Sequence, residues 1–389
     1  MGPAQATRAD LCSGDSPVVF AHISTSRDDG DDVAEPVRRV VVEASRRVKV
    51  LAALTPTEAH RERARLAREL SADRCPVPRW QYGPQEHADL RRAIDAAERS
   101  LGQRRTTALG ALFSARLREL SVEAALCASA GTSEVALLAR DRYRPAGPVA
   151  AAASAVCAAW LAEPSPVAST PLIASDDPDP RSLLSRMREE VGRLRLPFRV
   201  VASPSLAPLA AIGDCTILVA TGRLLPEEDA IRTVLHEVRG HAQPRARSLR
   251  AGSVLFEAGT ARGVDDQEGR ALLLEERAGL LGPRRRRQLA ARHRAVEAML
   301  GGATFGEVAR VLWREHGVDA IDAVVIAERA FRGSDGTCPG LGRERVYLES
   351  LVRVRAHLAA QPEDEVVLAS GQIAIEAIGA LRALAPTGN

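Results

Sequence analysis

The feature that most constrains the fold is a six-residue run, His236-Glu237-Val238-Arg239-Gly240-His241, within a stretch whose apolar spacing predicts a buried helix. Imidazole is a common zinc ligand, and Glu237 would lie on the metal side as the general base of a hydrolysis. On an ideal α-helix, however, side chains five residues apart diverge by roughly 140°. If His236 and His241 share a metal, the helix must widen into a π-bulge, which Gly240 would ease. Two partly buried imidazoles with ordinary hydrogen bonds are the alternative.

The composition is typical of a soluble globular protein, with 46% hydrophobic and 26% charged residues. A net charge of +3 gives no reason to expect nucleic acid as a partner. Six widely spaced cysteines form no C-x-x-C pair and favour a reducing compartment. The polar residues 1–16 give no sign of a signal peptide, and the apolar window Pro148–Ala162 is too short to span a bilayer. We therefore expect a cytoplasmic protein without membrane or nucleic-acid partners.

Four segments are predicted along the chain. We predict that residues 1–34 form a loose tail and that residues 35–163 form a helical N-terminal region. Residues 164–180 are predicted to form a Pro/Ser/Asp-rich linker, and residues 181–385 the candidate catalytic region. We expect the catalytic region to pack with the N-terminal region as one unit.

Helical periodicity covers most of the rest of the chain. It predicts helices within 35–72 (interrupted at 55–57), within 87–130, and at 148–162 (buried), 182–194, 226–242, 266–281, 284–300, 305–316, 320–330, 344–359 and 371–381. Strand signals occur at 198–201 and 215–220, and the second of these strands is expected to offer an edge to an extended peptide. The aromatics of the proline-stiffened connector Cys75–Tyr82 are expected to pack it onto the body.

A zinc hydrolase usually supplies three protein ligands and leaves the fourth position to water. The strongest third candidate is Glu268, because an acid on the core-facing side of an apolar helix is costly unless it is paired or metal-bound. The same residue also fits a plain N-terminal acid that the helix dipole stabilises. Glu257, Glu275 and Glu276 are weaker candidates.

A second cluster contains Arg329 and Arg332, a Gly-rich loop at 334–342, and Tyr347. Guanidinium groups bind carboxylates in bidentate fashion, and a phenol can donate to an oxyanion. These residues therefore suit the recognition of a peptide C-terminus. In so arginine-rich a chain, ordinary surface or ion-paired arginines are the alternative.

These motifs occur in the same order in one known family, which the chain resembles from about Cys75 to Leu381. It comprises bacterial proteins named for a QEGLA motif and associated with flavohaemoglobin expression, and the related microtubule-associated tyrosine carboxypeptidases of animals. The elements that carry the resemblance are His236–His241, Gln267–Gly269, Arg329–Gly333 and Val346–Leu348. The family is a zincin-like metallopeptidase group with an H-E-x-x-x-H motif and a downstream glutamate.

By position, the resemblance implies zinc on His236, His241 and Glu268, with Glu237 as the catalytic glutamate. It also implies that Arg329, Arg332 and Tyr347 line the substrate site. The chain departs from the family pattern at Val238-Arg239-Gly240, at Arg270 in place of an apolar residue, and in a longer loop that contains Cys338 and Pro339. Every candidate ligand is retained, so these departures concern the substrate pocket.

We therefore predict an α+β, mostly helical, zincin-like metallopeptidase fold with a short β-sheet preceding the H-E-x-x-x-H helix. The expected activity is Zn2+-dependent, carboxypeptidase-like hydrolysis at a peptide or protein C-terminus, with Tyr347 or an arginine steadying the oxyanion. The altered motif residues favour one alternative, a non-catalytic regulatory or binding protein on the same scaffold; hydrolysis of a non-peptide amide is another. Nothing in the sequence predicts tubulin binding, oligomeric state, or exo- as opposed to endo-cleavage.

Overall fold

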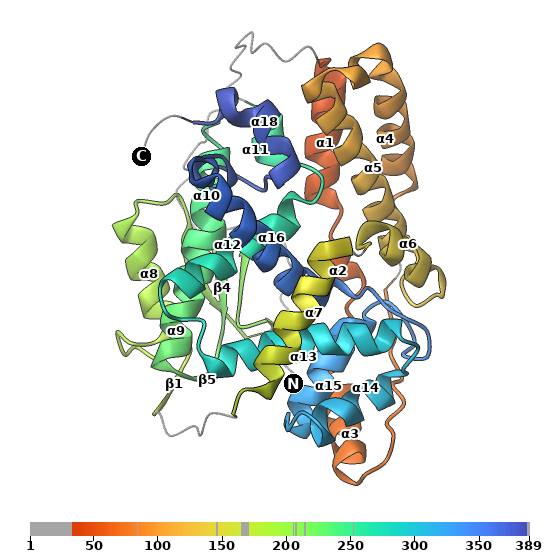
Figure 1. Ribbon diagram of the computed structural model, residues 1–389, viewed down its shortest axis with the longest axis vertical. Helices are drawn as coiled ribbons and strands as arrows, with labels where there is room; N and C mark the ends of the chain where they lie inside the picture. The colour runs from red at the N-terminus through yellow and green to blue at the C-terminus, as the bar shows by residue number, and fades with distance from the viewer. Residues whose placement is uncertain are drawn as a thin grey trace, which may run out of the picture. The chain divides into compact units, whose positions relative to one another are not determined.

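Apolar residues that recur every three to four positions build most of this protein, and the chain is mostly helical with two small sheets, as predicted for an α+β fold (Figure 1). The computed structural model describes residues 33–386 apart from 84, 145–146, 165–170, 205, 207, 214 and 252. All but the last two residues of the predicted tail, and residues 165–170 of the predicted linker, lie outside this part. The described residues all belong to one compact unit.

The first half of the chain folds mostly into helices. They are α1 (Glu35–Arg47), α2 (Val50–Ala53), α3 (Ala59–Ser71), α4 (Ala88–Ser100), α5 (Ala108–Ala128), α6 (Glu134–Arg142) and α7 (Gly147–Ala162). Helix α4 packs against α1 and α5, and α3 packs against α15 (Ala320–Phe331) (Figure 1).

The connector Cys75–Tyr82 forms neither helix nor strand. The Trp80 ring lies edge-on to Phe305, with 5.1 Å between the centroids. The Tyr82 hydroxyl donates to the Ser334 carbonyl at 2.8 Å. The prediction that its aromatics attach this segment to the body is therefore confirmed.

In the described part of the chain, five short strands form two sheets. The sequence predicted two of these strands. β1 (Leu172–Ala174) pairs antiparallel with β5 (Leu224–Pro226), and β1 lies within the predicted linker. In the second sheet, β4 (Thr216–Ala220) pairs parallel with β2 (Arg199–Ser203) and antiparallel with β3 (Ala210–Gly213). The predicted edge at 215–220 is wrong: β4 is the central strand, which suits the burial of its Ile217 and Val219.

The C-terminal half is also mostly helical, and its helices include those that carry the candidate site residues. They are α8 (Leu183–Arg193), α9 (Glu227–Val234), the π-helical segment η3 (Leu235–Ala242), α10 (Gln243–Ser248), α11 (Val254–Ala258), α12 (Gly263–Arg277), α13 (Pro283–Leu300), α14 (Phe305–Arg314), α15, the 3-10 turn η4 (Arg343–Arg345), α16 (Val346–Ala360), α17 (Glu365–Leu368) and α18 (Ile378–Leu381). Helix α12 packs along α16 (Figure 1). It also packs against η3.

Two helix predictions need correction. Helix α7 buries only Ala153 and Cys157 because it lies over α13 and α16 with its other side exposed. The continuous helix predicted at 371–381 is replaced by short turns that end in α18. There the Gln372 carbonyl accepts from the Thr260 amide at 2.9 Å, so it does not accept from a helical neighbour.

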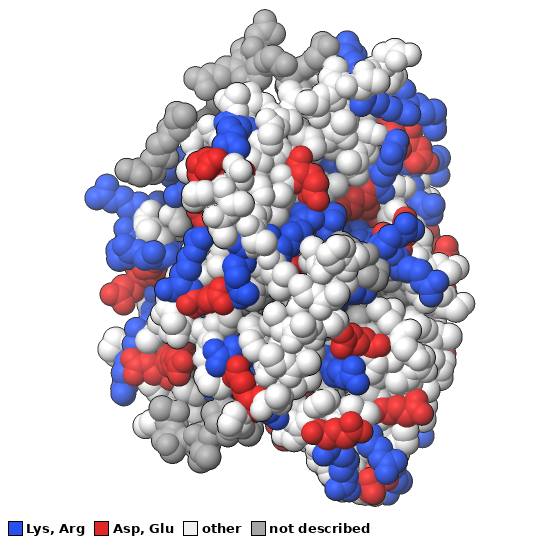
Figure 2. All heavy atoms as spheres, viewed as in Figure 1, with Lys and Arg blue, Asp and Glu red and all other residues white. Residues whose placement is uncertain are grey.

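The surface is mixed in charge. Figure 2 shows basic and acidic side chains interspersed over the face in view, in keeping with a net charge of +3. Among the described helices, none is by itself long and apolar enough to cross a membrane; α6 and α7 reach that measure only when joined across a bend of 101°.

The contact between α12 and α16 provides a stability test. A Cβ added at Gly269 would collide with the Ser350 backbone, which cannot move as a side-chain end can. We expect Gly269→Ala to lower the free energy of unfolding by about 1–3 kcal/mol in urea titrations. In the matched control Gly192→Ala, on α8, the added Cβ meets nothing within 4 Å, so stability should stay the same or rise. Equal stability of the two variants would contradict this packing.

Candidate metal centre and active site

The motif helix changes its winding where the two histidines occur. After α9 the chain is π-helical from Leu235 to Ala242 and then returns to α-helix in α10. A π-helix has a wider turn than an α-helix, which brings side chains five apart onto one side. The Nε2 atoms of His236 and His241 lie 3.3 Å apart. The predicted departure from regular helical geometry is confirmed.

Gly240 allows close packing of this segment because it has no side chain. A Cβ placed on it would lie 2.6 Å from the Ala271 Cβ, closer than two such carbons pack. Its φ is not positive, so the glycine is not needed for a left-handed conformation. The absence of a side chain instead lets η3 approach α12, the helix that carries Glu268.

Glu268 completes a triangle of potential ligand atoms. Its Oε2 lies 3.4 Å from the Nε2 of His236 and 3.6 Å from that of His241. Tetrahedral zinc with bonds of about 2.0–2.1 Å requires ligand atoms roughly 3.3–3.4 Å apart, so the three atoms fit this ion. The same Oε2 is buried and has no hydrogen-bond partner. These three residues can hold a metal.

The other polar atom of each of these side chains is held by a partner. His236 Nδ1 lies 2.7 Å from the Glu275 carboxylate, and His241 Nδ1 lies 2.8 Å from the Gln267 side-chain oxygen. Both partners accept hydrogen bonds, which fixes the tautomer with a free Nε2 lone pair. The remaining Glu268 oxygen accepts from Arg343 at 3.1 Å.

The three weaker candidates for the third ligand have other contacts. Glu275 stands behind His236 and also accepts from Arg285 at 3.1 Å. Glu257 pairs with Arg46 at 2.7 Å, and Glu276 pairs with Arg355 at 2.6 Å. The sequence analysis missed the supporting roles of Glu275 and Gln267. The position of Glu275, two helical turns beyond Glu268 on α12, was the available signal.

The carboxylates of the site differ in their proton affinity. Burial would raise the pKa of Glu268, but the neighbouring imidazoles of His236 and His241 and the charge of Arg343 hold that pKa well below its usual range. In Glu275, the charge of Arg285 and the bond to His236 outweigh burial and lower the pKa to about 2. Both carboxylates therefore remain charged and favour a cation between the imidazoles.

Glu237, between the two histidines in the sequence, differs from Glu268 and Glu275 in having no ion-pair partner among the described residues. Burial raises the pKa of its carboxyl group, and the two neighbouring imidazoles oppose that shift. Within the described residues no hydrogen bond or ion pair holds its oxygens, so the carboxylate is available to a substrate or a water. A raised pKa brings a carboxyl group closer to the range in which it can both take and return a proton.

Tyr347 lies beside the three ligand residues. Its ring lies near two guanidinium groups, with 5.8 Å from the ring centroid to Arg343 and 5.7 Å to Arg292. Arg343 in turn pairs with Glu268. Burial and then the charge of Glu268 raise the pKa of Tyr347, so the phenol stays protonated and can donate.

The other two predicted substrate residues, Arg329 and Arg332, form no ion pair with the ligand residues in the described part of the chain. Arg329 and Arg332 flank the buried Glu344 at 3.6 and 3.9 Å, and Arg292 approaches the same carboxylate at 3.6 Å. Arg292 joins this group to Tyr347. The sequence analysis missed Arg292, which looked like one more arginine of a basic helix.

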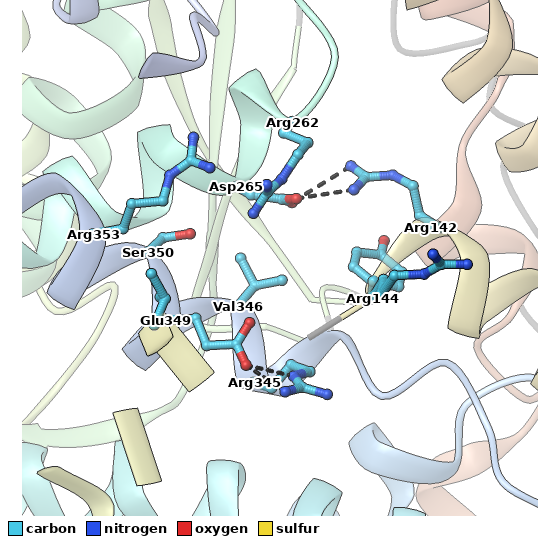
Figure 3. A pocket seen from close by; sticks show the side chains of 11 residues that line it. Arg142, Arg144, Arg262, Asp265, Arg345, Val346, Glu349, Ser350 and Arg353 are labelled. Atoms are coloured by element: carbon cyan, nitrogen blue, oxygen red, sulfur yellow. Dashed lines mark hydrogen bonds and ion pairs between the residues drawn. The ribbon is translucent and has the colours of Figure 1, made fainter. Parts of the chain in front are cut away.

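A second pocket, apart from the candidate site, is also lined by arginines. It is lined by residues from the end of α6 and the starts of α12 and α16 (Figure 3). Arg142 reaches Asp265 at 2.9 Å, and Arg345 reaches Glu349 at 2.7 Å. The guanidinium groups of both arginines are thus already bound by carboxylates of this protein, as expected of a structural ion-pair network.

The fit of η3 against α12 generates a test of the site. We expect Gly240→Ala to separate the two elements, to weaken metal binding, and to lower the free energy of unfolding by about 1–3 kcal/mol. Ala271→Gly removes the opposing methyl group and should recover part of both losses in the double variant. Metal titrations and urea unfolding of all four proteins in this cycle measure the coupling. Strictly additive effects would contradict the proposed contact.

One comparison with known proteins identifies a family. The sequence profile of the family described as microtubule-associated tyrosine carboxypeptidase matches residues 70–388, which include all the elements of the site. A search of curated proteins finds no match. The match covers most of the 389 residues, and the chain belongs to the microtubule-associated tyrosine carboxypeptidase family.

Proposed function

We propose that this protein is a zinc-dependent, carboxypeptidase-like peptidase, with Zn2+ held by His236, His241 and Glu268. One observation carries the proposal: the three ligand atoms lie 3.3–3.6 Å apart, and each side chain is fixed by a separate partner. Membership of a carboxypeptidase family supports the reaction class. A zinc ion bound there would polarise the scissile carbonyl and lower the pKa of a bound water.

The residues around the ligands have roles that follow from their settings. The unpaired Glu237 carboxylate takes the proton of the attacking water and passes it to the leaving amine. The Tyr347 hydroxyl donates a hydrogen bond to the oxygen on which negative charge develops. Arg329 and Arg332 attract the terminal carboxylate of the substrate. Arg343 neutralises one Glu268 oxygen and leaves the other to the metal.

The proposed substrate is a peptide or protein C-terminus. The matched family is described by its action as a tyrosine carboxypeptidase and by its association with microtubules. We extend to this chain only the release of a C-terminal residue. Neither the identity of that residue nor a microtubule partner is part of the proposal.

The residues that depart from the family motifs bear on the alternative, a non-catalytic regulator on this scaffold. Arg239 points to the surface and pairs with Glu190 at 2.8 Å. Arg270 pairs with Glu365 at 2.8 Å, and Gly240 packs against α12. None of these contacts occupies a ligand atom or the Glu237 carboxylate, so the departures give the alternative little support.

Metal content and turnover together test the proposal. The purified protein should contain one zinc per chain and should cleave members of a peptide library with free C-termini. Glu237→Gln should keep the metal and lose at least about 100-fold in turnover. His236→Ala should lose the metal. Full occupancy without any turnover in the wild-type protein would favour the regulator, and the absence of zinc would refute the site.

The support of His236 by Glu275 makes a separate prediction. Replacing a partner of this kind typically costs about 10–100-fold in metal affinity, so Glu275→Gln should weaken zinc binding by that factor in competition with a chelating dye. Glu276→Gln is the matched control on the same helix, because its carboxylate pairs with Arg355 at the surface. Equal zinc affinities of the two variants would contradict the role of Glu275.

A further inference from the structure

Three arginines next to the candidate site make no side-chain hydrogen bond within the described part of the chain. They are Arg292 on α13, Arg329 on α15 and Arg332 just after α15, and their side chains are only 12%, 22% and 13% exposed. All three surround one buried carboxylate, Glu344, at 3.6–3.9 Å. These distances exceed those of a hydrogen bond, and the buried Nε atoms of Arg292 and Arg332 have no hydrogen-bond partner among the described residues. Such unpaired buried donors require an explanation.

The charges of this group do not balance. Three guanidinium groups face one carboxylate, an excess of positive charge in a largely buried place. Burial and the neighbouring charge of Arg329 lower the pKa of Arg292 to about 9 and also lower that of Arg332. The arginines hold the pKa of Glu344 below its usual range although burial opposes this. An added anion would relieve the imbalance.

The arginines of the pocket in Figure 3 provide the contrast. Arg142 and Arg345 form direct hydrogen bonds of 2.7–2.9 Å to carboxylates of this protein. Their charges are already matched, which leaves no need for an external anion. The arginines around Glu344 differ in having donors to spare.

Tyr347 and Arg343 connect this arginine group to the candidate metal ligands. Arg292 approaches the Tyr347 ring from one side, and Arg343, which pairs with Glu268, lies at the same ring. Two helical turns before Arg292 on α13, Arg285 donates to Glu275 behind His236. One face of α13 therefore serves both the ligand residues and the arginine group.

We propose that Arg292 joins Arg329 and Arg332 in a receptor for the free α-carboxylate of a peptide substrate, and that Arg292 determines specificity for cleavage of the last residue. This inference rests on the proposed peptidase function. Only the amide nitrogen and Cα of the last residue separate its α-carboxylate carbon from the scissile carbonyl carbon. A receptor for the α-carboxylate must therefore lie next to the metal ligands. Tyr347 connects the three arginines to these ligands.

The test compares matched peptides that end in a free carboxylate or in an amide. Zinc-loaded, full-length Glu237→Gln protein, which should not turn over, is titrated with an N-acetyl dipeptide in both forms by calorimetry. We expect the acid to bind at least 10-fold more tightly than the amide. Arg292→Gln in this background should weaken binding of the acid by about 10–100-fold and leave the amide unchanged. Arg294→Gln, an exposed arginine on the same helix, is the control.

Stability and cleavage assays separate the possible failures. Because the charge of Arg292 is disfavoured where it lies, Arg292→Gln should not lower the midpoint of thermal unfolding. Equal binding of acid and amide, or acid binding that is insensitive to Arg292→Gln, would overturn the inference even if the wild-type protein cleaves both peptides. Acid binding that depends on Arg292 without cleavage by the wild-type protein would uphold the receptor and refute the proposed peptidase.

Discussion

The close packing of α12 against two neighbours is the constraint on which the candidate site depends. On one side, Gly240 lets the π-helical segment approach Ala271. On another, Gly269 lets α16 approach with the Ser350 backbone against the helix. Residues two apart on a helix point in nearly opposite directions, so α12 is held between both elements. Its Glu268 thereby reaches the two imidazoles.

The same helix also determines how the buried charges are arranged. It carries Gln267, Glu268 and Glu275, which means that one ligand and the partners of both histidines move as a rigid set. Burying such carboxylates is costly unless cations face them, and Arg285 and Arg343 do so. The arginines around Glu344 are the exception, since no hydrogen bond from the described residues matches their side-chain donors. In our proposal, that imbalance connects the packing to substrate recognition.

Much of the site could be predicted from the sequence because the signals were local. The five-residue separation of His236 and His241 required a wider helical turn, and the structure has one. Glu268 was predicted as the third ligand because it is an acid at a core-facing helix position. Its carboxylate lies within 3.6 Å of both histidines. The mostly helical α+β class followed from apolar periodicity in the same way.

The remainder depended on contacts between distant segments. The central place of β4 requires pairing with two strands, one of which, β3, is four residues long and poor in β-branched side chains. Arg292 precedes Tyr347 by more than fifty residues, and nothing in its own helix marks it. The exposed face of α7 reflects where it lies on α13 and α16 rather than its alanine-rich composition.

X-ray absorption at the zinc edge of the purified protein tests the central claim most directly, because it identifies the atoms bound to the metal. The account predicts two imidazole nitrogens and light oxygen ligands at about 2.0–2.2 Å, and the loss of one imidazole contribution in His241→Ala. Sulfur at about 2.3 Å would place the zinc on cysteines. That result, or a spectrum unchanged by His241→Ala, would contradict the site.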